Sequence, residues 1–269
     1  MATISILDRY VTPKRAIPRQ IEVGIGLSVA ALVFAAWFLA THTGYVSGDF
    51  LPSPGEVWQS FLKKINNGSL IKHVGVSLKE IYLGFFLSSL IAVPVGIFMG
   101  GFRIVAAAIE PLVNFMRYLP VTSMIPLLIL WIGIGIEEKI AVIFLGTFFQ
   151  QIVMVSDVAR GVQADLFNVS YTLGATRGQV VTRVLVPATL PGVLDTLRIT
   201  MGWAWTFLVV AELVAADSGL GYMILQSMRG LDPAGIFVGI FVIGFLGLLT
   251  DLVFKWIKRA VLPWENLGK

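Results

Sequence analysis

Long apolar runs recur along the whole chain, and they constrain the fold more than any other feature of the sequence. A helix needs about 20 apolar residues to cross the hydrocarbon core of a bilayer. Six runs reach or approach that length, and they lie within residues 21–40, 78–101, 105–135, 139–158, 192–216 and 234–257. None of them alternates as the strands of a membrane β-barrel do, and backbone groups in lipid must be satisfied within their own segment. The sequence therefore predicts an all-α membrane protein with about six transmembrane helices.

The composition agrees with lipid as the surrounding solvent. Of the 269 residues, 57% are hydrophobic and 13% are charged, whereas soluble domains carry about 25% charged residues. Cysteine is absent and the two histidines, His42 and His73, are far apart, which excludes thiolate chemistry and predicts no metal site. Basic residues beside membrane helices account for the net charge of +4, so we expect membrane lipid and no nucleic acid as a partner.

Basic residues beside the runs predict the orientation, because cytoplasmic loops of membrane proteins are enriched in lysine and arginine. They precede the first run, follow the last one and lie in the connections after the second and fourth runs. This group comprises Arg9, Lys14, Arg15, Arg19, Arg103, Arg160, Arg177, Arg183, Lys255, Lys258, Arg259 and Lys269. An even number of spans places both termini on one side, and we predict that this side is the cytoplasm. Lysines in the first outer loop make the charge signal less uniform.

This pattern predicts that the chain is divided into four segments. Residues 1–45 form an N-terminal cytoplasmic segment and the first transmembrane helix, and residues 46–77 form an outer loop. Residues 78–260 form the helical core, with a cytoplasmic connection at 159–191, and residues 261–269 form a cytoplasmic tail.

The outer loop contains the signals of a short amphipathic helix. Ser53 or Pro54 is predicted to begin it, and Asn66-Asn67-Gly68 is predicted to end it. Val57, Trp58, Phe61 and Leu62 would share its apolar face.

The third run is interrupted by proline and by polar residues. Pro111, Pro120 and Pro126 each remove a backbone donor. Polar side chains at membrane depth usually face a cavity or a partner, and discontinuous helices are common where transporters bind solutes. We therefore favour a pathway lining for this segment as a whole. For Arg117 itself, attraction of an anion is one interpretation. The interpretation we favour for this residue is structural: it snorkels, or it pairs with Glu110, seven residues away on the same helix face.

Other polar and aromatic side chains add candidates for this pathway. Trp203 and Trp205 are two residues apart and point to different faces of the fifth span, and Glu212 lies near its outer end. Gln150 or Gln151 is expected to hydrogen-bond across helices. The predicted substrate pathway comprises Asn114, Arg117, Thr122, Ser123, Trp203, Trp205 and Glu212. Each residue has a simpler alternative role in packing or in anchoring at the membrane interface.

The connection between the fourth and fifth spans is predicted to form two short helices. Residues 165–173 suit the first, and Gly174 allows a sharp turn. Thr176 can cap the second helix in a capping box with Gln179. Prolines at 187 and 191 are predicted to end that helix before the fifth span. Two such helices at an angle would form a knob suited to docking a soluble subunit.

At this connection the sequence resembles the "EAA" coupling loop of binding-protein-dependent ABC importer permeases. Gly174 matches the central glycine of that motif and Leu190-Pro191 match its end, whereas Asn168-Val169-Ser170 replace its acidic-Ala-Ala start. Segments elsewhere are similar to the nitrate/sulfonate/taurine branch of these permeases. They include Leu51-Pro52-Ser53-Pro54, Gly202-Trp203-Ala204-Trp205, Ala211-Glu212 and Gly219-Leu220-Gly221.

The resemblance implies a MetI-like permease fold in the bacterial inner membrane and a complex with several partners. These are a second permease copy in a homodimer, two cytoplasmic ABC ATPase subunits and an external substrate-binding protein or domain. ATP and magnesium would bind to the ATPase subunits, and no cofactor to this chain. The residues implied to contact the ATPase are Asn168, Val169, Ser170, Leu173, Gly174, Ala175, Arg177, Val186, Leu190 and Pro191.

The implied function is transport of a small, anionic solute such as nitrate, taurine or an alkyl sulfonate. No G-x-x-x-x-G-K-[ST] phosphate loop occurs in the chain, so we expect a permease subunit without catalytic residues. Alternatives are a secondary transporter without ATPase partners, a membrane enzyme and a channel. The first would need internal repeats, the second a catalytic cluster and the third a filter-like motif, none of which we find in the sequence.

Overall fold

A computed structural model describes residues 17–44 and 46–263, and every regular element in these residues is a helix. The elements are α2 (Arg19–His42), α3 (Pro54–Asn66), α4 (Ser69–Gly101), α5 (Arg103–Met116), α6 (Val121–Ile132), α7 (Ile136–Arg160), α8 (Ala164–Thr172), α9 (Arg177–Val180), the π-helix η1 (Val181–Leu185), α10 (Val186–Ala215), α11 (Leu220–Arg229) and α12 (Pro233–Val261).

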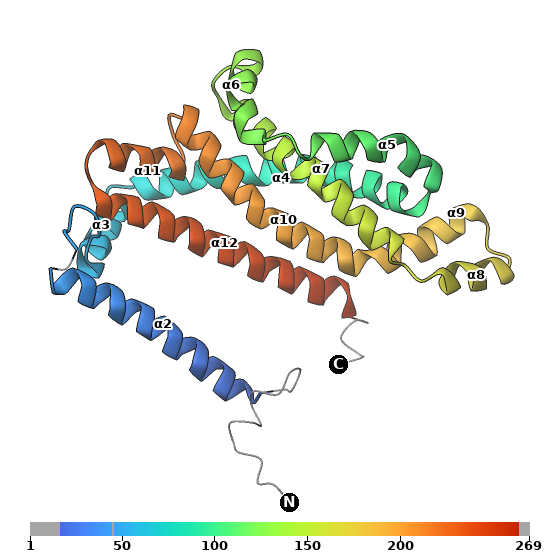
Figure 1. Cartoon of the computed structure of the whole chain (residues 1–269), viewed down its shortest axis with the longest axis horizontal. Coiled ribbons are helices and arrows are strands. Elements are labelled where there is room, and N and C mark those ends of the chain that lie inside the picture. The colour runs from blue at the N-terminus through green and yellow to red at the C-terminus, as the bar shows by residue number, and fades with distance from the viewer. Residues whose placement is uncertain (1–16, 45, 264–269) are drawn as a thin grey trace, which may run out of the picture.

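Five helices of the described residues are long and apolar enough to cross a membrane: α2, α4, α7, α10 with its extension from Arg177, and α12. They run along the long axis of the molecule (Figure 1). A sixth candidate span is the pair of α5 and α6, which is bent by 91° at a short break. The predicted all-α membrane fold, with an interrupted third span, is confirmed.

Small residues bring the central helices α4 and α7 into close contact. A Cβ atom on Gly84 would lie 2.8 Å from Ile143, and one on Gly96 would lie 2.7 Å from Val155. Glycine at these positions removes the side chain that would hold the two backbones apart, which is how helices associate tightly in lipid.

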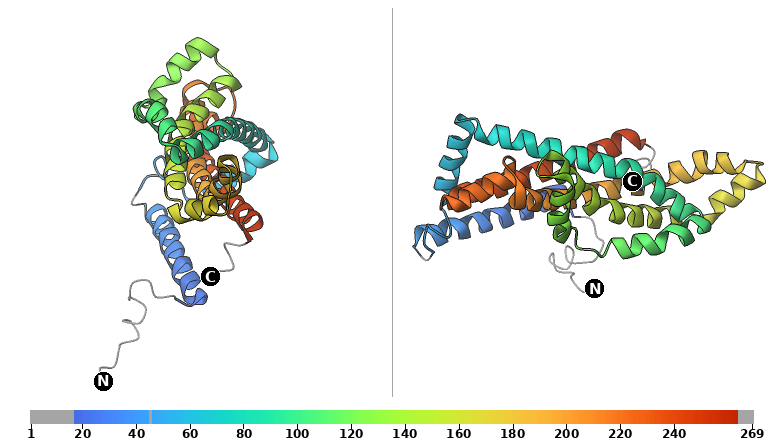
Figure 2. Two further views of the ribbon diagram at one scale, coloured as in Figure 1. Left: turned by 90° about the vertical axis from the view of Figure 1, so that its right-hand side faces the viewer. Right: turned by 90° about the horizontal axis from the view of Figure 1, so that it is seen from above.

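Helix α2 lies at the periphery, and none of its residues is buried. Its main contact is Trp37, whose ring stacks on Phe237 of α12 at a centroid distance of 6.1 Å. The indole Nε1 of Trp37 donates to the carbonyl of Pro52 at 3.0 Å. From this contact α2 diverges from the other helices (Figures 1 and 2). An apolar helix exposed on all sides is expected where lipid is the solvent.

The outer loop folds as the sequence predicts at its start and differs at its end. Ser53 and Glu56 form a reciprocal capping box that begins α3. The chain then turns at Gly68, whose φ is +72°, and α4 begins at Ser69, nine residues before the predicted start of the second span. The additional turns of α4 allow His73 and Ser77 to reach the turn between α10 and α11.

Different helices lie at the two ends of the bundle. Helices α3 and α11 lie at one end, and the hairpin of α8 and α9 projects from the other (Figures 1 and 2). The N-terminal end of α2 and the C-terminal end of α12 both lie toward the α8–α9 end of the bundle (Figure 1). This arrangement fits an even number of spans, and the cytoplasmic placement of this end remains a prediction.

Candidate functional site

The connection after α7 forms an elbow, which we define as residues 164–185. Helix α8 ends in a turn at Gly174, whose φ of +81° is one that glycine adopts without strain. Thr176 caps α9: Gln179 N donates to Thr176 Oγ1 at 3.4 Å, and Thr176 N donates to Gln179 Oε1 at 2.8 Å. The predicted helix, glycine turn and capping box are all present.

The predicted end of the second helix is wrong. Helix α9 continues through the π-turn η1 into α10, and Pro187 and Pro191 lie within the continuous helix. In the π-turn, Val186 N donates to the carbonyl of Val181, so the hydrogen-bond register shifts by one residue just before Pro187. The wider turn accommodates a residue that has no N–H to donate. The second part of the elbow, from Arg177 onward, therefore forms one helix of 39 residues with the fifth span, which ends at Ala215.

The elbow is anchored to the bundle on one side and exposes apolar side chains on the other. Leu185 of the elbow lies in one buried cluster with Val155 of α7 and Ile97 of α4, and Phe167 of α8 packs against that cluster. Leu173 is 82% exposed, and Val169 is exposed as well. Among the other residues implied to contact an ATPase, Asn168, Gly174 and Arg177 are exposed, and Ser170, Ala175, Val186, Leu190 and Pro191 are half-buried.

A second feature is a cavity of about 480 Å³ at the break between α5 and α6. Arg117 caps α5, and Pro120 precedes the first residue of α6. The walls come from this break, from the middle of α7 and from α10. They comprise Arg117, Tyr118, Leu119, Pro120, Val121, Thr122, Leu145, Gly146, Phe149, Gln150, Trp203 and Phe207. We call this space the break cavity.

Arg117 contacts its neighbour Tyr118 within the break cavity. Its Nη2 donates to the hydroxyl of Tyr118 at 3.0 Å, and its guanidinium carbon lies 4.8 Å from the centre of that ring. Its Nε is buried without a hydrogen-bond partner in the described residues. The structural pair with Glu110 is absent, because Glu110 accepts from Arg160 of α7 at 2.6 Å instead. Arg117 thus keeps hydrogen-bonding capacity that the described chain does not use.

The structure brings together three of the seven residues predicted for the pathway: Arg117, Thr122 and Trp203 line the break cavity. Asn114, Ser123, Trp205 and Glu212 do not line it. Trp205 lies on the other face of α10, where its Nε1 donates to Thr250 of α12 at 3.3 Å.

Several residues of the break cavity escape the sequence prediction. Gln150 carries a weak signal, because it is a polar residue within an apolar run. Phe207 and Gly146 carry none, since only packing reveals their role. A Cβ atom on Gly146 would lie 2.5 Å from the Phe207 ring, so this glycine lets the ring lie against the backbone of α7.

Glu212 is completely buried at the turn between α10 and α11. Ser77 Oγ donates to Glu212 Oε1 at 2.5 Å, and Gly221 N donates to Glu212 Oε2 at 2.5 Å. Ser77 Oγ also accepts from Leu220 N at 2.9 Å. A Cβ atom on Gly219 would lie 2.2 Å from the Glu212 carboxylate, which explains a glycine there. The carboxylate joins three helices, and both of its oxygens are occupied.

A similar buried network surrounds Gln151 at the centre of the bundle. Its Nε2 donates to Ser89 Oγ and Thr200 Oγ1, both at 3.2 Å, and its Oε1 accepts from Ser88 Oγ at 3.2 Å. Gln151 therefore hydrogen-bonds across helices, as the sequence suggests for one of the two glutamines.

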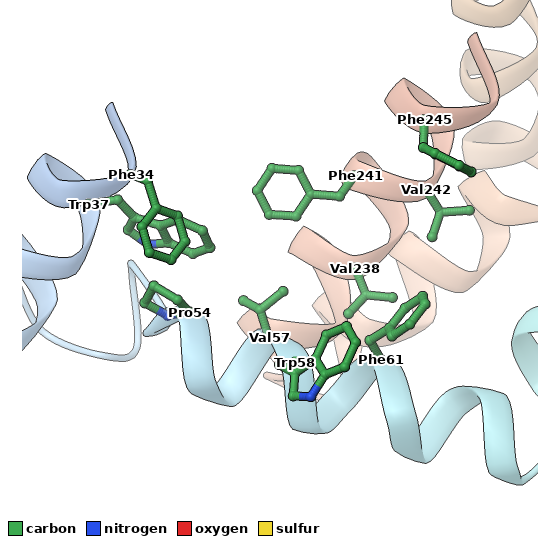
Figure 3. A pocket seen from close by; sticks show the side chains of 10 residues that line it. All are labelled: Phe34, Trp37, Pro54, Val57, Trp58, Phe61, Val238, Phe241, Val242 and Phe245. Carbon is green, nitrogen blue, oxygen red and sulfur yellow. The ribbon is translucent and has the colours of Figure 1, made fainter. Parts of the chain in front are cut away.

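A second cavity, of about 540 Å³, differs from the break cavity in its lining. Figure 3 shows aromatic and aliphatic side chains of α2, α3 and α12 around it, among them Phe34, Val57 and Phe241. The Nε1 of Trp37 is satisfied by Pro52. A charged solute would find few polar partners here, and this space opens between lipid-exposed helices. No group of three or more histidines and carboxylates in the described part of the chain is placed to hold a metal ion.

Comparison with known proteins identifies the family in which this architecture occurs. Residues 92–263 match the family model of the binding-protein-dependent transport system inner membrane component. A probable ABC transporter permease protein of Brucella abortus (strain 2308) is 38% identical, over 92% of this chain and 98% of the relative.

Two further relatives have more specific names. The putative aliphatic sulfonates transport permease protein SsuC of Bacillus subtilis (strain 168) is 34% identical, over 90% of this chain and 87% of the relative. The taurine transport system permease protein TauC of Escherichia coli (strain K12) is 33% identical, over 92% of this chain and 91% of the relative.

Among solved structures, an inward-facing conformation of the MetNI methionine ABC transporter is similar to the fold. The TM-score is 0.66 at 25% sequence identity, and the match covers 74% of this chain and 98% of that chain. On these matches, the chain belongs to the family of binding-protein-dependent transport system inner membrane components.

Proposed function

We propose that the chain is the membrane-spanning subunit of an ATP-driven importer for small organic sulfonates, such as taurine or an alkanesulfonate. The names of the relatives SsuC and TauC support this solute class. The family membership supports a pathway in the inner membrane that receives its solute from a binding protein. The partners in this proposal are a second permease copy, two ATPase subunits and an external binding protein.

The observation that carries the proposal is the elbow. It projects from one end of the bundle and exposes Leu173 and Val169 to solvent. Exposed apolar side chains rimmed by polar residues mark a protein interaction site. In this proposal the elbow docks into a cytoplasmic ATPase subunit, which binds ATP and magnesium. The α8–α9 end, and with it the beginning of α2 and the end of α12, then lies in the cytoplasm.

The continuous helix from Arg177 to Ala215 supplies a physical route for coupling. It begins in the elbow and carries Trp203 and Phe207 of the break cavity. A displacement of the elbow by ATP-driven closure of the ATPase subunits would move this helix as a unit. The permease would thereby change between outward-open and inward-open states, whose populations the nucleotide sets.

A matched pair of exposed leucines tests the docking surface. Leu173→Asp places a charge on the elbow, and Leu231→Asp places one at the opposite end of the bundle, where Leu231 is 89% exposed. We expect Leu173→Asp to lower co-purification of the ATPase subunits about tenfold, because a charge is buried without a partner in the interface. Leu231→Asp should leave co-purification unchanged. Equal recovery of the ATPase with both variants would contradict docking through the elbow.

A further inference from the structure

The break cavity lies at the depth of the membrane interior. Arg117 follows the 14 residues of α5 that begin at Arg103, which places it about 20 Å along the helix from that residue. Gly146 and Gln150 lie near the middle of the 25-residue helix α7. The cavity therefore lies away from the helix ends and from the charged side chains that gather there.

A charge at this depth is costly unless a partner compensates it. Two other arginines of the spans have such partners: Arg160 pairs with Glu110 at 2.6 Å, and Arg198 pairs with Asp251 at 2.5 Å. Arg117 has no carboxylate partner within the described residues, and its contacts are with Tyr118. The ring and hydroxyl of Tyr118 hold the guanidinium in place without neutralising it. The positive charge is left available to an anion.

The other walls of the break cavity divide into a polar and an aromatic part. Thr122 and Gln150 offer a hydroxyl and an amide, which can both donate to an oxyanion. Trp203, Phe207 and Phe149 provide apolar surface beside them. This combination suits a small molecule with one anionic group and a short organic tail. The planar fork of a guanidinium binds two oxygens of one such group.

We propose that the break cavity is an anion subsite of the translocation pathway, in which Arg117 binds the sulfonate group of the solute and Trp203 and Phe207 contact its organic part. This inference rests on the proposed import of small sulfonates. It assigns a solute contact to this chain, whereas a binding protein would select the solute outside the membrane. Because Trp203 and Phe207 lie on the helix that continues from the elbow, movement of that helix would change the subsite together with the ATPase state.

The test uses the complete importer, with its ATPase subunits and binding protein, reconstituted in proteoliposomes. Uptake of radiolabelled taurine and ethanesulfonate is measured with ATP supplied on the side of the membrane that carries the ATPase subunits. We expect Arg117→Gln to lower uptake by about tenfold or more, as loss of a charge-assisted hydrogen bond predicts. Arg117→Lys should restore part of the uptake, because it keeps the charge. Arg103→Gln removes an exposed charge at the other end of α5 and should leave uptake within about twofold.

A second measurement does not depend on transport. Phenylglyoxal modifies arginine side chains, and peptide mass spectrometry reports which residue has reacted. Ethanesulfonate should slow the modification of Arg117 in the wild-type complex and leave that of Arg103 unchanged. ATP hydrolysis stimulated by the binding protein should persist in Arg117→Gln, which shows that the complex has assembled.

The outcomes separate the subsite from the proposed function. If the wild-type importer accumulates sulfonate and Arg117→Gln does so equally well, the subsite is wrong and the importer stands. The subsite is also wrong if the importer transports sulfonate but ethanesulfonate does not slow the modification of Arg117 by phenylglyoxal. If the wild-type complex accumulates neither sulfonate, the proposed solute class is wrong, and the sulfonate assignment of the cavity falls with it.

Discussion

Gln150 and Gln151 are neighbours in α7, yet they lie in two regions that differ in whether polar groups find hydrogen-bond partners within the chain. Gln151 lies in a buried network where its amide exchanges hydrogen bonds with Ser88, Ser89 and Thr200. Gln150 faces the break cavity with Arg117, whose Nε has no partner among the described residues. Satisfied polar groups hold helices together in lipid, whereas unsatisfied ones beside a cavity can bind a solute. The comparison thus separates a structural region from a functional one.

Glu212 lies in a second buried network of this structural kind, at the turn between α10 and α11, and gives the largest expected effect on stability. Glu212→Ala leaves Ser77 Oγ and Gly221 N without their acceptor in a buried site. We expect a loss of about 3 kcal/mol, since each unsatisfied buried donor costs about 1–3 kcal/mol. Thermal unfolding of the purified chain in detergent, followed by tryptophan fluorescence, measures it. An unchanged unfolding midpoint would contradict a structural role for Glu212.

A substitution at Gly219 tests the same buried network, because it alters the backbone turn beside the Glu212 carboxylate. Its φ is +109°, and a Cβ atom would lie 2.2 Å from the Glu212 carboxylate. Gly44 is the matched control, because its φ is +69° and a Cβ atom added there would have no neighbour within 4 Å. We expect Gly219→Ala to cost about 2 kcal/mol or more and Gly44→Ala about 1 kcal/mol, the difference being the steric contact with the carboxylate. Equal shifts of the unfolding midpoint would show that the turn relaxes freely.

The two glutamines give the smallest effect and the most direct comparison. Gln151→Leu removes hydrogen bonds to three side chains and should destabilise the chain by about 1–2 kcal/mol. Gln150→Leu should change stability by less than about 0.5 kcal/mol and lower sulfonate uptake a few-fold, because it removes a donor from the break cavity. Unfolding midpoints and uptake are measured for both variants. If Gln150→Leu is the less stable variant, the division between the two regions is wrong.

Local patterns in the sequence determine much of this protein. Runs of about 20 apolar residues predict the spans, because their own backbone hydrogen bonds must be satisfied within lipid. The capping boxes at Ser53 and Thr176 and the turn at Gly174 follow from residues three positions apart or fewer. The elbow is therefore predictable except at its end, where the π-turn before Pro187 keeps the helix continuous.

Only the tertiary structure decides which polar residues of the spans face one another. Lipid is as apolar as the protein core, so hydrophobic periodicity does not distinguish an inward face from an outward one. Glu110 could pair along its helix with Arg117 by spacing alone, and it pairs with Arg160, 50 residues away in the sequence, instead. Trp203 and Trp205 are equivalent as a sequence pattern, yet one lines the break cavity and the other hydrogen-bonds to α12. These choices depend on contacts between distant segments, which no local pattern encodes.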